Sequence, residues 1–370
     1  MNEWDSKMTG IIDGHVHMGS IAQEAGLLAI LEATGVHKMA LVSIQNPAAG
    51  AGLAQSLYMK ARHPETFYVF ASLNHAAQLT GGRVKTPSLA AQVDDFVAMG
   101  CDGIKMIEGK PTSRQMMNIP VTDAYFADYW ARVAETDLPI VWHVNDPEEF
   151  WDPERIPGWA KERNWGYGPD DVQKETLYAE VDEILDRHPH LRIIFAHFYF
   201  LSADLERAGR FLDAHPTVCL DLTPGIEMLY NLSCEPDASR EFFIKYADRI
   251  VFGTDIASGL TVEEGHVRAG IVFRWLESTD TFRVPETSDF LLGPPTDGII
   301  RGMTLPDDVL TKIYRDNFVY KAGAQPRALD VPKAIEVCER LAVIAEAMSD
   351  APPAETEAGK VAQYLKASRR

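Results

Sequence analysis

Short apolar runs rich in β-branched residues alternate along the chain with segments in which apolar residues recur at helical spacing. The segment containing Leu177, Val181 and Ile184 shows this helical spacing most clearly. Eight runs have the length and composition of buried strands, at residues 11–17, 38–45, 67–74, 101–107, 138–144, 191–197, 217–223 and 249–255. Eight repeats of a strand followed by a helix predict an α/β fold, the (β/α)8 or TIM barrel.

Two connections are too long to be plain turns, namely residues 146–172 after the fifth strand and 256–303 after the eighth. Both leave the C-terminal ends of strands, where barrels of this kind carry their active sites, so we expect both to wall the substrate pocket. Beyond residue 325 the repeat stops. We therefore expect a catalytic barrel over residues 1–325 and a C-terminal helical extension over 326–370, packed on the barrel or on a partner subunit.

Charge and composition exclude several classes of partner. The 370 residues include 35 Lys and Arg against 54 Asp and Glu, a net charge of −19. Nucleic acids and anionic membranes both attract basic surfaces, so we expect neither as a partner. The four cysteines form no paired motif, and the chain has no long apolar run and no signal-like start, which predicts a cytoplasmic protein. Barrels of this kind are commonly oligomeric, and we expect a homo-oligomer that acts on a small-molecule substrate.

The histidines separate by their positions relative to the predicted strands. Five lie just before a strand, at the end of the barrel opposite to the catalytic face: His37, His63, His188, His190 and His215. Four others lie at the C-terminal ends of strands: His15, His17, His143 and His197. A single histidine on an apolar strand is usually a satisfied core residue. Four at one level of a barrel instead indicate a shared site.

These strand ends carry the donor atoms of a metal centre. His15 and His17 are two residues apart on a strand, so their side chains point to the same side. Asp255 ends the eighth strand, and closure of the barrel brings it toward this pair together with His143 and His197. Imidazole nitrogens and carboxylate oxygens suit Zn²⁺, and Fe²⁺ or Mn²⁺ would accept the same ligands. The sequence therefore predicts a divalent metal, with zinc as the expected ion.

Lys105 lies in the fourth predicted strand, where an unpaired ammonium beside a divalent cation would be costly. It could pair with Glu108 or Asp255, or extend past the strand end into solvent. It could also react with carbon dioxide to form a carbamate, an anion able to bridge two metal ions. The sequence does not choose among these alternatives.

Taken together, these elements resemble the amidohydrolase superfamily, in particular its amidohydrolase-related (amidohydrolase 2) branch of metal-dependent TIM-barrel hydrolases and decarboxylases. The resemblance covers residues 11 to about 322. It consists of five elements in the family's strand order: His15-x-His17, Lys105, His143, His197 and Gly253-Thr254-Asp255. Members of this superfamily share one fold and catalyse many different reactions. The resemblance is therefore informative about the cofactor and much less informative about the substrate.

The resemblance implies two alternative ligand arrangements. In single-metal members, His15, His17 and Asp255 hold the ion together with His143, while His197 faces the substrate. In two-metal members, the second ion is held by His143 and His197, with a carboxylated Lys105 between the two ions. One ion is expected, and a second remains open.

Hydrolysis of a small carbonyl compound, such as an amide, ester or lactone, is the function we expect first. A metal would acidify a water molecule and polarise the carbonyl. Asp255 would take the proton of that water and deliver it to the leaving group. His197, when it is not a ligand, would stabilise the developing oxyanion or act as the base, and Lys105 completes the expected catalytic set.

Two other functions stay open. Decarboxylation of an aromatic or unsaturated acid is the first, because similar proteins use the same His, His, His, Asp frame. It needs a cation for the carboxylate, which Arg268, Arg274 or an arginine of residues 146–172 could supply. It leaves Lys105 without a clear task, which favours hydrolysis. The second is a metal-free or noncatalytic barrel. The sequence contains no nucleotide-binding motif, so we expect no nucleotide cofactor.

Overall fold

The computed structural model describes residues 4–225, 227–288, 290–293, 295–296 and 298–368. Each of the eight predicted runs coincides with one strand of a parallel sheet, and only β4 extends past its run, by two residues: β1 Ile12–His17, β2 Lys38–Val42, β3 Phe67–Ser72, β4 Gly103–Gly109, β5 Ile140–Val144, β6 Ile193–Phe195, β7 Val218–Asp221 and β8 Ile250–Val251. Neighbours in the chain are neighbours in the sheet, from β8 back to β1. The predicted TIM-barrel fold is confirmed.

The sheet closes through a short ninth strand. β9, Ile256–Ala257, follows β8 and pairs with the end of β1, where Val16 is opposite Ile256. The amide of Gly14 also donates a hydrogen bond of 2.9 Å to the carbonyl of Phe252. The segment between β8 and β9 is thereby held against β1, and Asp255 lies in this segment.

Alternation along the strands builds two apolar layers. On β2, Ala40 and Val42 belong to a cluster inside the barrel, whereas Met39 and Leu41 belong to the larger cluster beneath the helices. This follows from the two-residue period of a strand, which sends successive side chains to opposite faces. Phe318, at the start of α14 (Asn317–Ala322), joins the inner cluster and packs edge-on against Tyr68.

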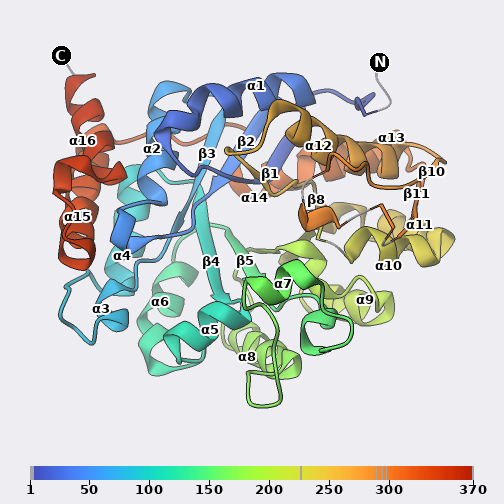
Figure 1. Ribbon diagram of the computed structural model, residues 1–370, viewed down its shortest axis with the longest axis horizontal. Helices are drawn as coiled ribbons and strands as arrows, with labels where there is room; N and C mark the ends of the chain where they lie inside the picture. The colour runs from blue at the N-terminus through green and yellow to red at the C-terminus, as the bar shows by residue number, and fades with distance from the viewer. Residues whose placement is uncertain (1–3, 226, 289, 294, 297, 369–370) are drawn as a thin grey trace.

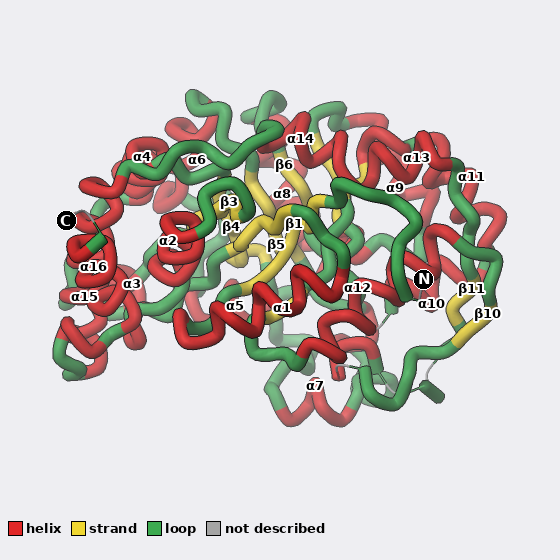
Figure 2. The backbone as a smooth tube through the Cα atoms, turned by 90° about the horizontal axis from the view of Figure 1, so that it is seen from above, coloured by secondary structure: helices red, strands yellow, loops and turns green. Residues whose placement is uncertain are grey.

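Helices surround the strands on all sides, as the views in Figures 1 and 2 show. The helices that follow β1 to β7 are α1 Glu24–Thr34, α2 Leu53–Arg62, α3 Ala76–Leu79, α4 Leu89–Met99, α5 Pro111–Met117, α6 Ala124–Ala134, α7 Gly158–Glu162, α8 Lys174–Arg187, α9 Leu205–Ala214, α10 Met228–Cys234 and α11 Pro236–Lys245. No helix in the described part of the chain has the length and apolar character needed to cross a bilayer.

The two long connections differ in structure. Residues 146–172 contain only α7 and a short 3-10 turn. Residues 256–303 are not one continuous loop, because they contain the 16-residue α12, Val262–Glu277, and a two-stranded ribbon of β10 (Thr281–Phe282) and β11 (Ile300–Arg301). Thr261 and Glu264 form a capping box that starts α12, a local signal for a helix N-terminus.

After α13 (Asp307–Thr311) and α14, the chain continues into two further helices, α15 Val331–Ser349 and α16 Glu357–Ala367. They pack against each other and, on one side of the molecule, against α2 and α4 (Figure 1). The described part of the predicted extension, residues 326–368, therefore contains two α-helices that contact the barrel's own helices within one chain. The domain boundary at residue 325 remains a prediction.

Candidate metal centre

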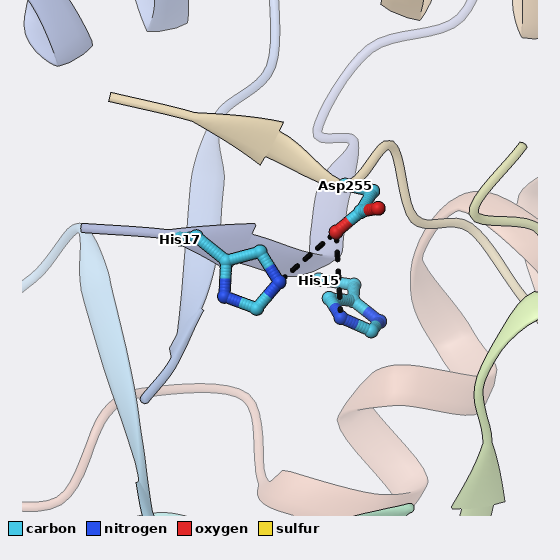
Figure 3. A group of neighbouring side chains, drawn as sticks. All are labelled: His15, His17 and Asp255. Atoms are coloured by element: carbon cyan, nitrogen blue, oxygen red, sulfur yellow. Dashed lines mark ion pairs between the residues drawn. The ribbon is translucent and has the colours of Figure 1, made fainter. Parts of the chain in front are cut away.

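Three of the predicted ligands meet at one point of the barrel mouth. The Nε2 atom of His17 lies 2.9 Å from Oδ1 of Asp255, and Nε2 of His15 lies 3.8 Å from the same oxygen. One donor atom from each of the three side chains lies within 4.8 Å of the other two. Figure 3 shows both imidazole rings directed at the carboxylate. Two imidazoles and one carboxylate are a set of ligands that divalent metals use.

Asp13 attaches the strand that carries the histidines to the segment that carries Asp255. Its Oδ2 accepts a hydrogen bond of 2.6 Å from the Thr254 hydroxyl, and its Oδ1 accepts from the amides of Thr254 and His15, each at 3.1 Å. The Asp255 amide also donates to the His15 carbonyl, at 2.9 Å. Burial raises the pKa of Asp13 to about 7. Asp13 therefore positions the centre from below rather than binding metal.

Hydrogen bonds at Nδ1 orient both histidines. His17 Nδ1 lies 2.8 Å from the Val42 carbonyl, and since a carbonyl only accepts, Nδ1 carries the hydrogen and Nε2 is left as the donor atom for a metal. His15 Nδ1 lies 2.8 Å from Oδ2 of Asp221. Burial lowers the pKa of His15 to about 4, so this ring is neutral near pH 7. Both rings thus present Nε2 to the same point.

Asp221, the last residue of β7, is a positioning residue. Besides His15, it accepts hydrogen bonds at Oδ1 from the amides of His197 (2.8 Å) and Thr223 (3.1 Å). Burial alone would raise the pKa of Asp221, but the interactions with His15, His197 and Thr223 together outweigh burial and lower the pKa to about 2. A single buried carboxylate therefore holds elements of β1, β6 and β7 together.

His143 and His197 lie beside the three-residue group, on the same pocket, and not within it. Their ring centroids are 4.7 Å apart, and the ring of His197 is 5.7 Å from that of His15. His143 Nε2 lies 3.0 Å from the Asn145 carbonyl and so carries a hydrogen. Only its Nδ1 is left as a potential ligand atom. The ligand roles of these two histidines remain predictions.

His197 begins a turn of unusual backbone geometry. His197, Phe198, Tyr199 and Phe200 have φ angles of 55°, 54°, 56° and 51°, in the left-handed region that residues with a side chain rarely adopt. The Tyr178 hydroxyl stabilises the turn by donating to the Tyr199 carbonyl, at 3.0 Å. Such local strain is often found at functional sites. The turn directs His197 and Phe200 to the pocket, and no sequence pattern predicted it.

Lys105 is directed into the centre rather than toward solvent. Its Nζ lies 3.1 Å from Nε2 of His15, and the residue is only 2% exposed, which excludes the solvent-reaching alternative. Glu108, one of its expected partners, instead contacts His75, with 2.7 Å between Oε1 and Nε2. Burial lowers the pKa of Lys105 to about 8. Carboxylation of Lys105 remains a prediction.

The centre forms the floor of a pocket of about 320 Å³. Four aromatic side chains line its upper wall: Phe150, Trp159, Trp165 and Phe200. Three of them come from residues 146–172, which confirms that this connection walls the pocket. The 256–303 connection contributes Ala257 and Leu291. The pocket therefore combines a polar floor with an aromatic wall.

Two arginines that the sequence offered for a substrate carboxylate, and His266 in the same long connection, have structural contacts. Arg268 is buried behind the centre, where it donates to the Thr254 carbonyl (2.5 Å) and lies 3.7 Å from Oδ2 of Asp255. Arg274 stacks against the Phe282 ring, at 4.4 Å. His266 contacts Asp5 at 3.1 Å. Of these residues, only Arg268 contacts the candidate metal centre.

Sequence reasoning missed an ion pair in the pocket wall, between Lys110 and Asp146. Lys110, just after β4, forms an ion pair with Asp146, just after β5, and its ammonium lies 4.7 Å from the centre of the Trp165 ring. Asp146 also accepts a 2.5 Å hydrogen bond from the Tyr167 hydroxyl and lies 3.3 Å from His143 Nε2. Both residues follow the C-terminal ends of strands, and this position could have identified them as candidate site residues from the sequence.

Glu227, just before α10, is a buried carboxylate behind the pocket wall. It is 7% exposed, and neither of its side-chain oxygens accepts a hydrogen bond within the described residues. A Cβ atom on the wall residue Gly225 would lie 2.9 Å from its Oε2. Burial raises the pKa of Glu227 from 4.5 to about 7.

This raised pKa predicts a loss of stability on going from acid to neutral pH. Below pH 4.5 Glu227 is protonated in both states, whereas between 4.5 and about 7 only the unfolded chain releases the proton. The group therefore lowers the free energy of unfolding across this interval, by roughly 3 kcal/mol in total. Glu227→Gln should remove this slope, measured as melting temperatures at pH 5 and pH 8. The exposed Glu235→Gln serves as control, and equal slopes in wild type and Glu227→Gln would contradict the prediction.

A family model described as "Amidohydrolase" matches residues 12–317. None of the curated proteins compared with the chain matches it. An uncharacterized TIM-barrel protein from Bordetella bronchiseptica aligns with a TM-score of 0.50 and 15% identity, over 85% of this chain and 99% of that chain.

Two further solved structures are less similar. A dihydroxybenzoic acid decarboxylase from Polaromonas sp. with bound manganese aligns at a TM-score of 0.49 and 14% identity, over 85% of this chain and 96% of that one. Dihydroorotase from Saccharomyces cerevisiae aligns at 0.41 and 13%, over 80% and 94%. The alignment with the Bordetella bronchiseptica protein, at 15% identity, supports the barrel fold alone.

Proposed function

Because this chain belongs to the amidohydrolase family, we propose that it is a metal-dependent hydrolase of a small carbonyl compound, an amide, ester or lactone with an apolar body. One observation carries the proposal: His15, His17 and Asp255 converge on the floor of a pocket of about 320 Å³ that has an aromatic wall. A polar floor orients the reacting group, and an apolar wall binds the rest of the molecule.

The residues present fit a divalent metal. Two Nε2 atoms and one carboxylate oxygen are available, and hydrogen bonds to Val42 and Asp221 hold both rings in the required orientation. Zinc, manganese and iron all accept this donor set. When bound there, the ion supplies a Lewis acid beside the substrate carbonyl.

The chain's own residues supply proton transfer and orientation. Asp255, between the two histidines, accepts the proton of the attacking water and passes it to the leaving group. His197 lines the same pocket, and burial lowers its pKa well below the usual range, so the neutral ring donates or accepts a hydrogen bond at the substrate. Phe150, Trp165 and Phe200 exclude bulk water from the reacting groups.

Decarboxylation of an aromatic acid is a second candidate, and one observation favours it. Lys105 and Lys110 both line the pocket, and within the described residues no carboxylate lies at hydrogen-bonding distance from Lys105. A substrate carboxylate could therefore bind this ammonium while its ring contacts the aromatic wall. Lys105 thus has a task in decarboxylation, which the sequence had not indicated.

Metal removal tests what both candidates share. Dialysis against a chelator is expected to lower turnover by at least about 100-fold, because the centre loses its Lewis acid. Addition of zinc or manganese should restore turnover, and elemental analysis of the untreated protein should find about one ion per chain. Full activity in metal-free protein would defeat both candidates.

A parallel substrate panel separates the candidates. Esters, amides and lactones with an aromatic group are assayed for hydrolysis, and the matching aromatic acids are assayed for release of carbon dioxide, with the same metal-loaded protein. Hydrolysis without carbon dioxide release supports the first proposal. Carbon dioxide release alone replaces it with decarboxylation.

A further inference from the structure

A groove of about 500 Å³ runs between α8 and α9, on the outside of the barrel behind β6. Tyr178, Asp182 and Asp186 follow each other at intervals of four residues, so they line the groove along one face of α8. Arg210 and Phe211 line it from α9. The groove is separate from the pocket above the metal centre, and the proposed function does not use it.

The two walls of the groove carry opposite charges. The α8 wall presents two carboxylates, and the α9 wall presents two guanidinium groups. The arginines contact other acids, since Arg207 binds Glu175 through two hydrogen bonds of 2.8 Å and Arg210 pairs with Glu206. In the part of the chain that the structure describes, Asp182 and Asp186 take part in no ion pair or hydrogen bond through their side chains. The charges facing each other across the groove are therefore not joined directly.

The groove also contains a buried hydroxyl without a partner. Tyr199 lines the groove and is 2% exposed, and its hydroxyl makes no hydrogen bond within the described residues. Its ring packs against those of Phe195, Phe211 and Tyr178, with centroid distances of 4.2, 4.8 and 4.9 Å. Leaving a buried hydroxyl unpaired is costly, and a bound molecule would remove that cost.

We propose that this groove binds a small zwitterion, an α-amino acid with an apolar side chain. Its ammonium group faces Asp182, its carboxylate faces Arg210, and its side chain lies on the rings of Tyr199 and Phe211. The Tyr199 hydroxyl gains the hydrogen bond that the protein does not provide. A ligand without an ammonium group would leave Asp182 and Asp186 without an ion pair, and a ligand without a carboxylate would make no use of the guanidinium groups of the opposite wall.

The position of the groove links it to the metal centre. Tyr199 belongs to the left-handed turn of residues 197–200, and His197 and Phe200 of that turn line the catalytic pocket. Tyr178, on the α8 wall, holds the turn through its hydrogen bond to the Tyr199 carbonyl. A ligand in the groove therefore contacts the segment that positions His197.

Calorimetric titration of the metal-loaded protein with L-phenylalanine and L-leucine tests the proposal. Saturable binding is expected for both. N-Acetyl-L-phenylalanine lacks the ammonium and phenethylamine lacks the carboxylate, so each should bind about 10-fold more weakly or worse. Absence of binding up to about 10 mM amino acid would overturn the proposal. This titration needs no substrate, so its failure is distinct from failure of the proposed function.

Variants locate the binding. Asp182→Asn and Arg210→Gln alter exposed side chains and should each weaken binding about 10-fold, and Tyr199→Phe should weaken it less. Amino acids also chelate metal ions, so Asp255→Asn is the matched control and should leave the affinity unchanged. The reverse pattern, with Asp255→Asn abolishing binding and Asp182→Asn sparing it, would place the ligand at the metal centre and overturn the proposal.

Hydrogen exchange gives an independent readout. A ligand in the groove should slow exchange at the amides of residues 197–200, because it packs on Tyr199 and restrains the turn. A ligand that binds while exchange at these amides is unchanged lies elsewhere and contradicts the assignment.

Discussion

Asp255→Asn is expected to lower turnover by about 10²–10⁴-fold while the barrel remains folded. The carboxylate has two tasks at this position: its Oδ1 lies within 4 Å of both His15 and His17 Nε2, and it is the proposed proton acceptor. An amide of the same shape cannot take up a proton at neutral pH and is a weaker metal ligand. The measurements are kcat/KM on the substrate found in the panel, and the metal content after gel filtration.

The control for this variant is Asp248→Asn. Asp248 is exposed and lies just before β8, at the opposite end of the barrel from Asp255, so its replacement should leave both measurements unchanged. Circular dichroism should be the same for wild type and both variants. Full turnover in Asp255→Asn would remove the proposed proton acceptor, even if the metal content had fallen.

Asp221→Ala is expected to cost both stability and metal affinity. The change removes the acceptor of His15 Nδ1 and of the Thr223 amide, both of which are buried, whereas the His197 amide keeps the Thr223 hydroxyl as an acceptor at 3.1 Å. Loss of such buried partners should lower the free energy of unfolding by about 3 kcal/mol. Loss of the group that orients His15 should weaken metal binding by about 10- to 100-fold.

Urea unfolding of the metal-free protein measures the first effect of Asp221→Ala, and competition with a chromogenic chelator measures the second. Asp213→Ala, an exposed position on α9, is the matched control and should change stability by no more than about 0.5 kcal/mol. If Asp221→Ala bound metal as tightly as wild type, Asp221 would not be the residue that orients His15.

Much of the fold could be predicted from the local pattern of apolar and polar residues. Seven barrel strands lie within the predicted runs, and β4 extends two residues past its run. The agreement arises because a buried parallel strand needs a short continuous apolar segment, and such a segment is visible in the sequence. The position of His15, His17 and Asp255 at strand ends was accessible for the same reason. Parallel strands of one barrel all end on one face, so residues distant in the chain could be expected to meet.

Other features depended on contacts between distant segments. Asp221 acts on His15, which is 206 positions away, and Lys110 pairs with Asp146 across two strands. The two-residue period of β5 places His143 at the pocket, but its Nε2 faces the Asn145 carbonyl and Asp146. Strand periodicity sets the side of the sheet to which a residue points, and it does not set the rotation of the ring at the end of the side chain.

The sequence alone determined the order of strands and helices, the barrel, and the set of residues at its mouth. It could do so because hydrophobic spacing is a local property of the chain. Only the tertiary structure decided which nitrogen each imidazole presents and where Lys105 points. It alone showed that residues 197–200 form a left-handed turn. Each of these depends on hydrogen bonds and packing with partners brought close by closure of the barrel, and spacing along the chain carries no record of such partners.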